Sequence, residues 1–320
     1  MERWKIDMKK IGIMITIFLL TAMVISGCQN AEQEAKEEDT VLSLGMMSSS
    51  DVIPFVMIKE LGLDEEYGFT LNLETFTSAP DRDAALQAGE LDGVISDYIG
   101  VTMYHKGGYD VRITGITDGD FILMAGKNTG IESLEKIDGQ SIAISQNTLI
   151  EYSLDYILEE AGMSTDRVQK EVVARIPDRL ELLRNEQIDL GLMPEPFATL
   201  ALNDGATYIK SANDLGLYPS VSAFSMDSIE AKEEAVRKLY EAYNEAVAYI
   251  NTTDIAEYDE IVIEAVGYPE EMLGQIEIGE YRENQLPPKE AIEKAIDWAV
   301  ERDLTDENLT YEDITYDVMP

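Results

Sequence analysis

The sequence contains few of the residues from which most catalytic and metal sites are built. It has one Cys and one His in 320 residues, so a disulfide within the chain and a zinc site of the usual Cys/His type are both excluded. It also lacks G-x-S-x-G, H-E-x-x-H, G-x-x-x-x-G-K-[ST] and a G-x-G-x-x-G that follows a strand. These absences disfavour an enzyme, and we expect no cofactor and no metal.

Positive charge is also scarce. The chain has 24 Lys and Arg against 63 Asp and Glu, which gives a formal net charge of −39. Such a surface repels phosphate backbones, so we expect no nucleic-acid partner. Because 45% of the residues are hydrophobic, the chain can still bury a core, and we interpret the acidic excess as a solvated surface.

One long hydrophobic run is present, at the N-terminus. It extends over the 15 residues Ile11 to Ile25 after several basic residues, which is shorter than the roughly 20 residues that span a bilayer. The run ends in Ile25-Ser26-Gly27-Cys28, which resembles a bacterial lipobox. We interpret residues 1–27 as a signal peptide and Cys28 as the lipidated first residue of the mature protein. The alternative is a plain secretory peptide with an incidental Cys.

The residues after Cys28 are polar and acidic. Residues 28–40 show no hydrophobic period, which is typical of a flexible tether. Removal of residues 1–27, which carry four basic and two acidic side chains, changes the formal charge from −39 to −41.

An internal repeat organises the rest of the chain. Pro80-Asp81-Arg82 and Leu91-Asp92 match Pro177-Asp178-Arg179 and Ile188-Asp189 at a constant separation of 97 residues. Each copy lies in a β-α-β-α-β pattern, too long for a solenoid unit. The pattern predicts an α/β protein of two lobes, each a mainly parallel sheet flanked by helices. Its ligand crevice is expected outside the carboxyl ends of the strands.

We expect the first lobe to comprise residues 41–118 and 219–320, and the second lobe residues 119–218. The expected strands of the first lobe are Val41–Gly45, Thr70–Phe76, Gly93–Ser96, Val111–Ile116 and a returning strand Val221–Met226. Its expected helices are Val52–Leu61, Asp81–Ala88 and Tyr98–Lys106. In the second lobe the expected strands are Phe121–Ala125, Ser141–Ser145, Glu171–Ile176, Leu190–Met193 and Thr207–Ile209.

The two lobes are expected to be joined by two crossings, near residues 118–121 and 211–220, with Asp118 and Asp120 as hinge residues. Hydrophobic stripes at helical spacing follow, one between Val236 and Ile250 and one between Ile292 and Val300. We expect both helices to pack on the first lobe.

Polar and aromatic residues gather at the predicted strand carboxyl ends and helix N-termini. In the first lobe they are Ser48, Ser49, Ser50, Thr77, Ser78, Asp97 and Tyr98; in the second they are Asn147, Thr148, Glu151, Tyr152, Glu195 and Phe197. We expect two half-sites that close on a small molecule. For each Ser or Thr, capping of a helix is the alternative. For Asp97 and Glu195 the alternatives are bracing of the cleft and an acid/base pair of the glycosidase type.

Several stretches together resemble a known family. The lipobox, Asp92–Asp97, Gly139–Ser145 and Glu195–Ala198 are similar to ABC-transporter substrate-binding lipoproteins of the NMT1/THI5-like branch, which serves aliphatic sulfonates, nitrate and thiamine-pyrimidine precursors. The resemblance implies a periplasmic-binding-protein type II fold with extra C-terminal helices, a monomer, a small-molecule ligand, and a permease and its ATPase as partners. The Cys-rich iron motif and active His of the family's pyrimidine synthases match no stretch here.

The charges of the expected site bear on the ligand. It contains three carboxylates and no Lys or Arg, so a desolvated anion would be repelled. Carboxylates beside Tyr98, Tyr152 and Phe197 suit a flat nitrogen heterocycle that stacks on a ring and donates N–H groups. An aminopyrimidine-like thiamine precursor is therefore the expected ligand, and a sulfonate or nitrate-type anion is the alternative. A carboxylate-based enzyme and a surface adhesin are the competing functions.

The lipobox generates the first testable prediction. Cys28→Ala should leave the protein unprocessed or release it from the membrane, because two acyl chains hold a lipoprotein firmly and each buried CH₂ contributes about 0.8 kcal/mol. Membrane fractionation and the mass of the mature protein measure this. Unchanged fractionation together with an unchanged mass would contradict the assignment.

Overall fold

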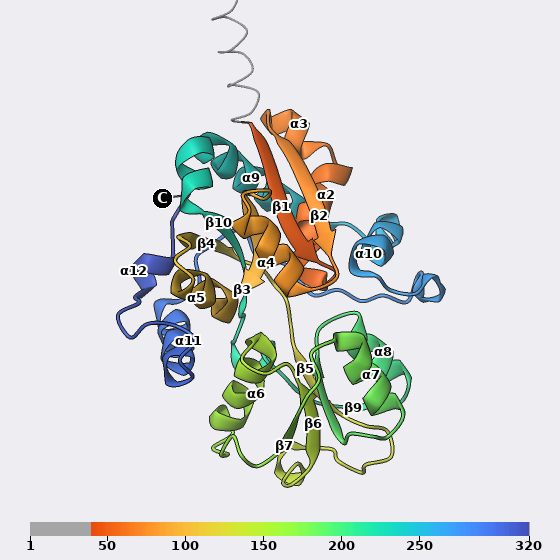
Figure 1. Ribbon diagram of the computed structural model, residues 1–320. Helices are drawn as coiled ribbons and strands as arrows, with labels where there is room; N and C mark the ends of the chain where they lie inside the picture. Colours follow the sequence, from red (N-terminus) through yellow and green to blue (C-terminus); the bar gives the residue numbers. More distant parts are fainter. Residues whose placement is uncertain (1–39, 320) are drawn as a thin grey trace, which may run out of the picture. The chain divides into compact units, whose positions relative to one another are not determined.

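A computed structural model describes residues 40–319 of the chain. The expected signal peptide, the expected lipidation site Cys28 and nearly all of the expected tether lie outside these residues. The described part contains two β-sheets, each flanked by helices (Figure 1). The first sheet has the strand order β2-β1-β3-β10-β4, and the second has the order β7-β6-β8-β5-β9. The predicted α/β fold with two lobes is confirmed.

The first sheet is mixed. Its strands are β1 (Val41–Met47), β2 (Thr70–Phe76), β3 (Gly93–Asp97), β4 (Val111–Ile116) and β10 (Ser220–Ser225). β1 and β3 run parallel, whereas β10 lies antiparallel between β3 and β4. The associated helices are η1 (Ser50–Val52), α2 (Ile53–Glu60), α3 (Leu63–Tyr67), α4 (Ala79–Gln87) and α5 (Tyr98–Lys106).

The second sheet has the same plan. Its strands are β5 (Ile122–Ala125), β6 (Ser141–Ile144), β7 (Gln169–Val172), β8 (Leu190–Met193) and β9 (Thr207–Ser211). β6 is parallel to β7 and β8, and β5 is antiparallel to β8 and β9. The helices are η2 (Leu134–Lys136), α6 (Leu149–Glu160), α7 (Ile176–Arg184), α8 (Phe197–Asn203) and η3 (Asn213–Leu215).

Side-chain alternation places different helices on the two faces of this second sheet. Ile142 and Ile144 of β6 share a buried cluster with α6, whereas Ala143 between them belongs to a second cluster with Leu180 and Leu183 of α7. This is the period of two that a strand covered on both faces requires. The helices α6 and α7 therefore lie on opposite faces of the second sheet.

The C-terminal region is helical. It contains α9 (Met226–Thr252), η4 (Ile255–Glu257), α10 (Asp259–Val266), η5 (Glu270–Met272), α11 (Lys289–Glu301) and α12 (Tyr311–Ile314). Val236 and Leu239 of α9 pack in one core with Phe55 of α2. Ile292 and Ala299 of α11 lie in the core that also holds α5. Both hydrophobic stripes pack on the first lobe, as predicted.

Most of the expected elements occur, and one is misplaced. The strands Thr70–Phe76, Val111–Ile116 and Leu190–Met193 and the helix Tyr98–Lys106 have the predicted bounds. The expected strand Glu171–Ile176 is wrong, because β7 ends at Val172 and Ile176 is already the first residue of α7. Pro177 lies in the first turn of that helix, where its fixed φ favours helix initiation over a strand.

The chain passes between the sheets in two segments. The first joins the end of β4 at Ile116 to the start of β5 at Ile122, and the second joins Ser211 of β9 to Ser220 of β10. Both segments coincide with the crossings expected from the sequence. The lobe boundaries at residues 118–119 and 218–219 themselves stay a prediction.

The repeat is visible in backbone contacts as well as in topology. The carboxylate of Asp92, which precedes β3, accepts a hydrogen bond of 2.8 Å from the backbone N–H of Ser43 in β1. The carboxylate of Asp189, which precedes β8, accepts one of 2.8 Å from the N–H of Ser141 in β6. The repeated Asp therefore joins two neighbouring parallel strands in each lobe.

Candidate functional site

The predicted site residues follow the carboxyl ends of strands in both lobes. Ser48, Ser49 and Ser50 follow β1, Thr77 and Ser78 follow β2, and Asp97 and Tyr98 join β3 to α5. Asn147, Thr148, Glu151 and Tyr152 lie at the start of α6, and Glu195 and Phe197 follow β8. The alternation of strands and helices is responsible for this placement, because each helix begins where a strand ends.

The carboxylate of Asp97 is engaged within its own helix. It accepts a hydrogen bond of 2.8 Å from the N–H of Gly100 and is the N-cap of α5. Burial raises the pKa of Asp97 above its ordinary value, although the Gly100 N–H and the nearby Arg82 lower it. This carboxylate therefore caps α5, and its expected contact with a ligand stays a prediction.

The two carboxylates of the second lobe are engaged in the same way. Glu151 accepts a hydrogen bond of 2.7 Å from the N–H of Asn147 and one of 3.0 Å from the ammonium group of Lys170. Burial raises the pKa of Glu151, but these two partners hold it below its ordinary value. Glu195 accepts from the backbone N–H of Thr199 at 3.1 Å and from its hydroxyl at 2.9 Å. All three expected ligand acceptors thus accept hydrogen bonds from the protein.

The hydroxyl residues divide into caps and others. Ser78 caps α4 through the N–H of Asp81, and Thr148 caps α6 through the N–H of Ile150. Ser48 and Thr77 are exposed. For Ser78 and Thr148, therefore, the capping role that the sequence left as the alternative is the one the contacts show.

Asp51 was not among the predicted site residues. Its buried carboxylate accepts hydrogen bonds from the hydroxyls of Ser49 and Thr117. Burial raises the pKa of Asp51 above its ordinary value, and this effect is larger than the lowering by the two hydrogen bonds. The backbone carbonyl of Ser50 accepts 2.7 Å from the hydroxyl of Tyr281. A polar contact network therefore joins the end of β1 to the first crossing and to the C-terminal region.

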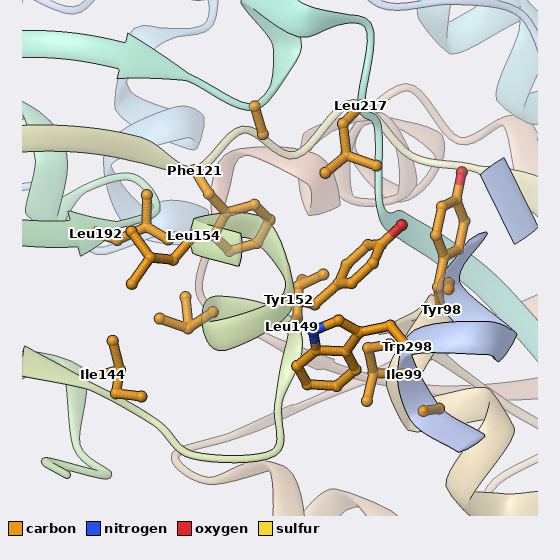
Figure 2. Close-up of a cluster of buried hydrophobic side chains, with 14 of the residues drawn as sticks. Tyr98, Ile99, Phe121, Ile144, Leu149, Tyr152, Leu154, Leu192, Leu217 and Trp298 are labelled. Carbon is orange, nitrogen blue, oxygen red and sulfur yellow. The ribbon is translucent and has the colours of Figure 1, made fainter. Parts of the chain in front are cut away.

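The structure brings Tyr98 of the first lobe and Tyr152 of the second into one buried cluster, together with Trp298 and Leu217 (Figure 2). Tyr98 and Tyr152 are 1% and 3% exposed, and the rings of Tyr152 and Trp298 meet edge to face with centroids 5.5 Å apart. Burial raises the pKa of both tyrosines. The hydroxyl of Tyr152 has no hydrogen-bond partner in residues 40–319. Phe197 packs in a different cluster.

Asp155 links the second lobe to the C-terminal helices and was missed in the sequence. Its fully buried carboxylate accepts three hydrogen bonds: one of 2.6 Å from Lys170, one of 3.0 Å from the indole N–H of Trp298 and one of 2.7 Å from Arg302. The guanidinium carbon of Arg302 lies 3.9 Å from the ring centroid of Trp298. A negative charge of α6 is therefore neutralised partly by a residue just beyond α11.

A second missed contact joins the two crossings. Arg282 donates from its backbone N–H, at 2.8 Å, and from its Nε, at 2.7 Å, to the carboxylate of Asp118 in the first crossing. Its guanidinium carbon lies 3.7 Å from the ring centroid of Tyr218 in the second crossing. The segment before α11 therefore contacts both crossings, and the hinge role expected of Asp118 stays a prediction.

The described part of the chain has an open pocket away from the predicted site residues, but neither a metal-binding cluster nor a membrane-spanning helix. Within residues 40–319, no group of three His, Cys, Asp or Glu side chains is arranged to hold a metal ion. His105 bonds the carbonyl of Val111 at 2.8 Å and lines an open pocket of about 340 Å³ that contains none of the predicted site residues. In the same part of the chain, no helix is both long and apolar enough to cross a membrane.

Comparison with known proteins gives a consistent family. Residues 35–263 match the NMT1-like family. An ABC transporter periplasmic binding protein of Brachyspira hyodysenteriae is 22% identical over 258 residues, which are 74% of this chain and 73% of the relative. The crystal structure of the periplasmic aliphatic sulphonate binding protein SsuA from Escherichia coli superposes with a TM-score of 0.73 at 16% identity, covering 87% of this chain and 92% of SsuA.

The fold by itself does not decide between binding and catalysis. The desulfurization enzyme DSZB also shares it, with a TM-score of 0.60 at 14% identity and coverage of 87% of this chain and 96% of the enzyme. At such identities a structural likeness shows the fold alone. The function must be argued from the residues.

The contacts of Asp155 generate a prediction on stability. Asp155→Asn should lower the free energy of unfolding by about 3–5 kcal/mol, because Lys170 and Arg302 lose a buried negative charge. Asp306→Asn removes one of the two exposed partners of Lys106, 2.8 Å away, and should cost far less, because exposed ion pairs contribute little. Denaturant unfolding followed by circular dichroism measures both. Equal losses in the two variants would be incompatible with the described contacts.

Proposed function

Because the chain belongs to the NMT1-like family, we propose that it is the solute-binding component of an ABC importer, which captures one small molecule between its lobes and delivers it to a permease and ATPase. The observation that carries the proposal is the duplicated strand end. In each lobe a central strand, β3 or β8, runs into a helix-capping carboxylate beside a segment that crosses to the other lobe. Ligands of parallel α/β sheets bind at such strand ends. The relative from Brachyspira hyodysenteriae supports the same function.

The ligand class must be reconsidered in the light of the contacts. The preference for an aminopyrimidine depended on carboxylates that receive N–H groups from the ligand. Asp97, Glu151 and Glu195 instead accept hydrogen bonds from the protein. Their repulsion of an anion is correspondingly reduced, since each negative charge is shared with a helix N-terminus or a Lys. An oxyanion of the sulfonate or nitrate type is therefore our first candidate, supported by the likeness to SsuA. The aminopyrimidine stays an unconfirmed prediction.

The cellular arrangement follows from the sequence. We propose that the mature protein is a monomer held on the extracytoplasmic face of the cell membrane by lipid on Cys28, with residues 29–40 as a tether. Cys28 lies outside the described residues. A tethered receptor stays close to its permease, so a ligand that has been captured does not have to be carried there by a freely diffusing protein.

Closure of the lobes on the ligand is the expected motion. The two crossings are short, and Asp118 and Tyr218 in them contact the same residue, Arg282. A hinge typically consists of a small number of loop residues that absorb the change in φ and ψ. We therefore propose that the lobes rotate about these crossings while Arg282 keeps the two segments together.

A compound panel tests the proposed function. Ethanesulfonate, taurine, nitrate and an aminopyrimidine are added to the mature chain while its melting temperature and radius of gyration are measured. A true ligand at 100 times its Kd should add about 2.7 kcal/mol to stability, which corresponds to a rise of roughly 5–10 °C, and should reduce the radius of gyration. Consumption of any compound would indicate an enzyme. Absence of stabilisation and of compaction throughout the panel would contradict the receptor.

A further inference from the structure

Each lobe buries one Arg at the same position of the repeat. Arg82 lies in the first turns of α4 and Arg179 in the first turns of α7, 97 residues apart, and they are 5% and 2% exposed. The Nη1 of Arg82 donates 2.6 Å to the carbonyl of Ile95 in β3. The Nη1 of Arg179 donates 3.4 Å to the carbonyl of Leu192 in β8. Both guanidinium groups therefore lie beside the last residues of a central parallel strand.

The charge of Arg82 is compensated. Its Nε and Nη2 donate to the same carboxylate oxygen of Asp83 at 2.9 and 2.8 Å, and its Nη2 is 3.3 Å from the hydroxyl of Ser96. The hydroxyl of Tyr104 donates 2.6 Å to that Asp83 oxygen. The first lobe thus pairs its buried Arg with a half-buried carboxylate through several hydrogen bonds.

The charge of Arg179 has no such partner. The position that matches Asp83 is Leu180, and the Nε of Arg179 has no hydrogen-bond partner within residues 40–319. Burial lowers the pKa of Arg179 to about 10, and no neighbouring acid raises it. The side chain is still cationic at neutral pH. The second lobe therefore contains a buried, uncompensated guanidinium group at the edge where a ligand of this fold class binds.

A buried cation without a partner is costly for folding, because desolvation is not offset by an opposite charge. A guanidinium presents its N–H donors in a planar fork that fits two oxygens of one oxyanion. We propose that Arg179 binds the oxyanion of the transported solute, of the sulfonate or nitrate type, in the second lobe. This proposal depends on the proposed receptor function and adds to it the residue that selects for negative charge.

A purely structural role for Arg179, support of the Leu192 carbonyl, makes a different prediction. If Arg179 were a structural clamp, Arg179→Met would lower the melting temperature. If it is retained for an anion, Arg179→Met removes an unpaired buried charge and leaves the melting temperature equal to or above that of the wild type. Arg82→Met, in contrast, leaves Asp83 without its cation and lowers the melting temperature. A destabilised Arg179→Met variant would count against the proposal.

Binding is measured by calorimetry on the mature chain with ethanesulfonate, acetate, nitrate and inorganic sulfate at constant ionic strength. We expect Arg179→Met to weaken the oxyanion that binds the wild type by about 100-fold, the effect of losing two charge-assisted hydrogen bonds. Arg184→Met is the control: Arg184 lies on the same helix, pairs with Glu181 and Asp204, and its loss should change Kd less than about threefold. Tighter binding of ethanesulfonate than of sulfate would indicate recognition of a whole solute. Tighter binding of sulfate would indicate recognition of the oxyanion alone.

Several results would overturn the inference. One is an Arg179→Met variant that binds the oxyanion within threefold of the wild type, and another is a wild type that binds none of these anions. If an aminopyrimidine binds both forms equally, the receptor function stands and the role of Arg179 is wrong. If no compound binds, both proposals fail.

A spectroscopic measurement on the wild type tests the binding role of Arg179 independently of the stability of Arg179→Met. The Nε–H resonance of Arg179 is identified by its loss in Arg179→Lys, which keeps the charge. It should shift when the oxyanion is added to the wild type. A resonance that does not move at saturating oxyanion would show that Arg179 is not the binding group.

Discussion

A guanidinium group that is taken out of water requires either a negative charge or several hydrogen-bond acceptors nearby. Each sheet has one such buried guanidinium group beside the carboxyl end of its central strand. In both lobes an Arg of the first helical turns reaches the last residues of the central strand, β3 or β8, and so fixes how the helix meets the strand. The first lobe supplies Asp83 as counterion. The second lobe supplies Leu180 at the matching position. Two lobes of one plan therefore differ in charge where a solute would be held.

The C-terminal region contacts both crossings and the second lobe. The segment before α11 contributes Arg282, which contacts Asp118 and Tyr218 of the two crossings. α11 and the residue after it contribute Trp298 and Arg302, which both bond the buried Asp155 of the second lobe. Residues that follow the repeat therefore contact both crossings and one side of the second lobe.

Much of the fold is predictable from the sequence because its causes are local or periodic. The matching Pro-Asp-Arg segments reveal two lobes, and the hydrophobic stripes locate α9 and α11. The strand expected to end at Ile176 fails because Pro177 starts a helix there, a signal that was present and was outweighed by the apolar residues before it. The placement of candidate residues at strand ends follows directly from the alternation of strands and helices.

The chemistry of the site was less predictable. The roles of Asp97, Glu151 and Glu195 depend on hydrogen bonds to groups three or four residues away, so the capping alternative was available in the sequence. The C-terminal partners of Asp155 and Asp118 lie 143 to 164 residues away and carry no motif. The sequence shows Leu180 where the first repeat has Asp83. That no other side chain of residues 40–319 pairs with the Nε of Arg179 depends on the arrangement in space.

Native mass spectrometry of protein purified without denaturation from the cells that express it shows whether this chain captures one small solute. We expect a single small adduct of defined mass that bears an oxyanion group and is released unchanged on denaturation. A chain that carries no adduct, and that gains none when sulfonates, nitrate or pyrimidines are added, would contradict this expectation.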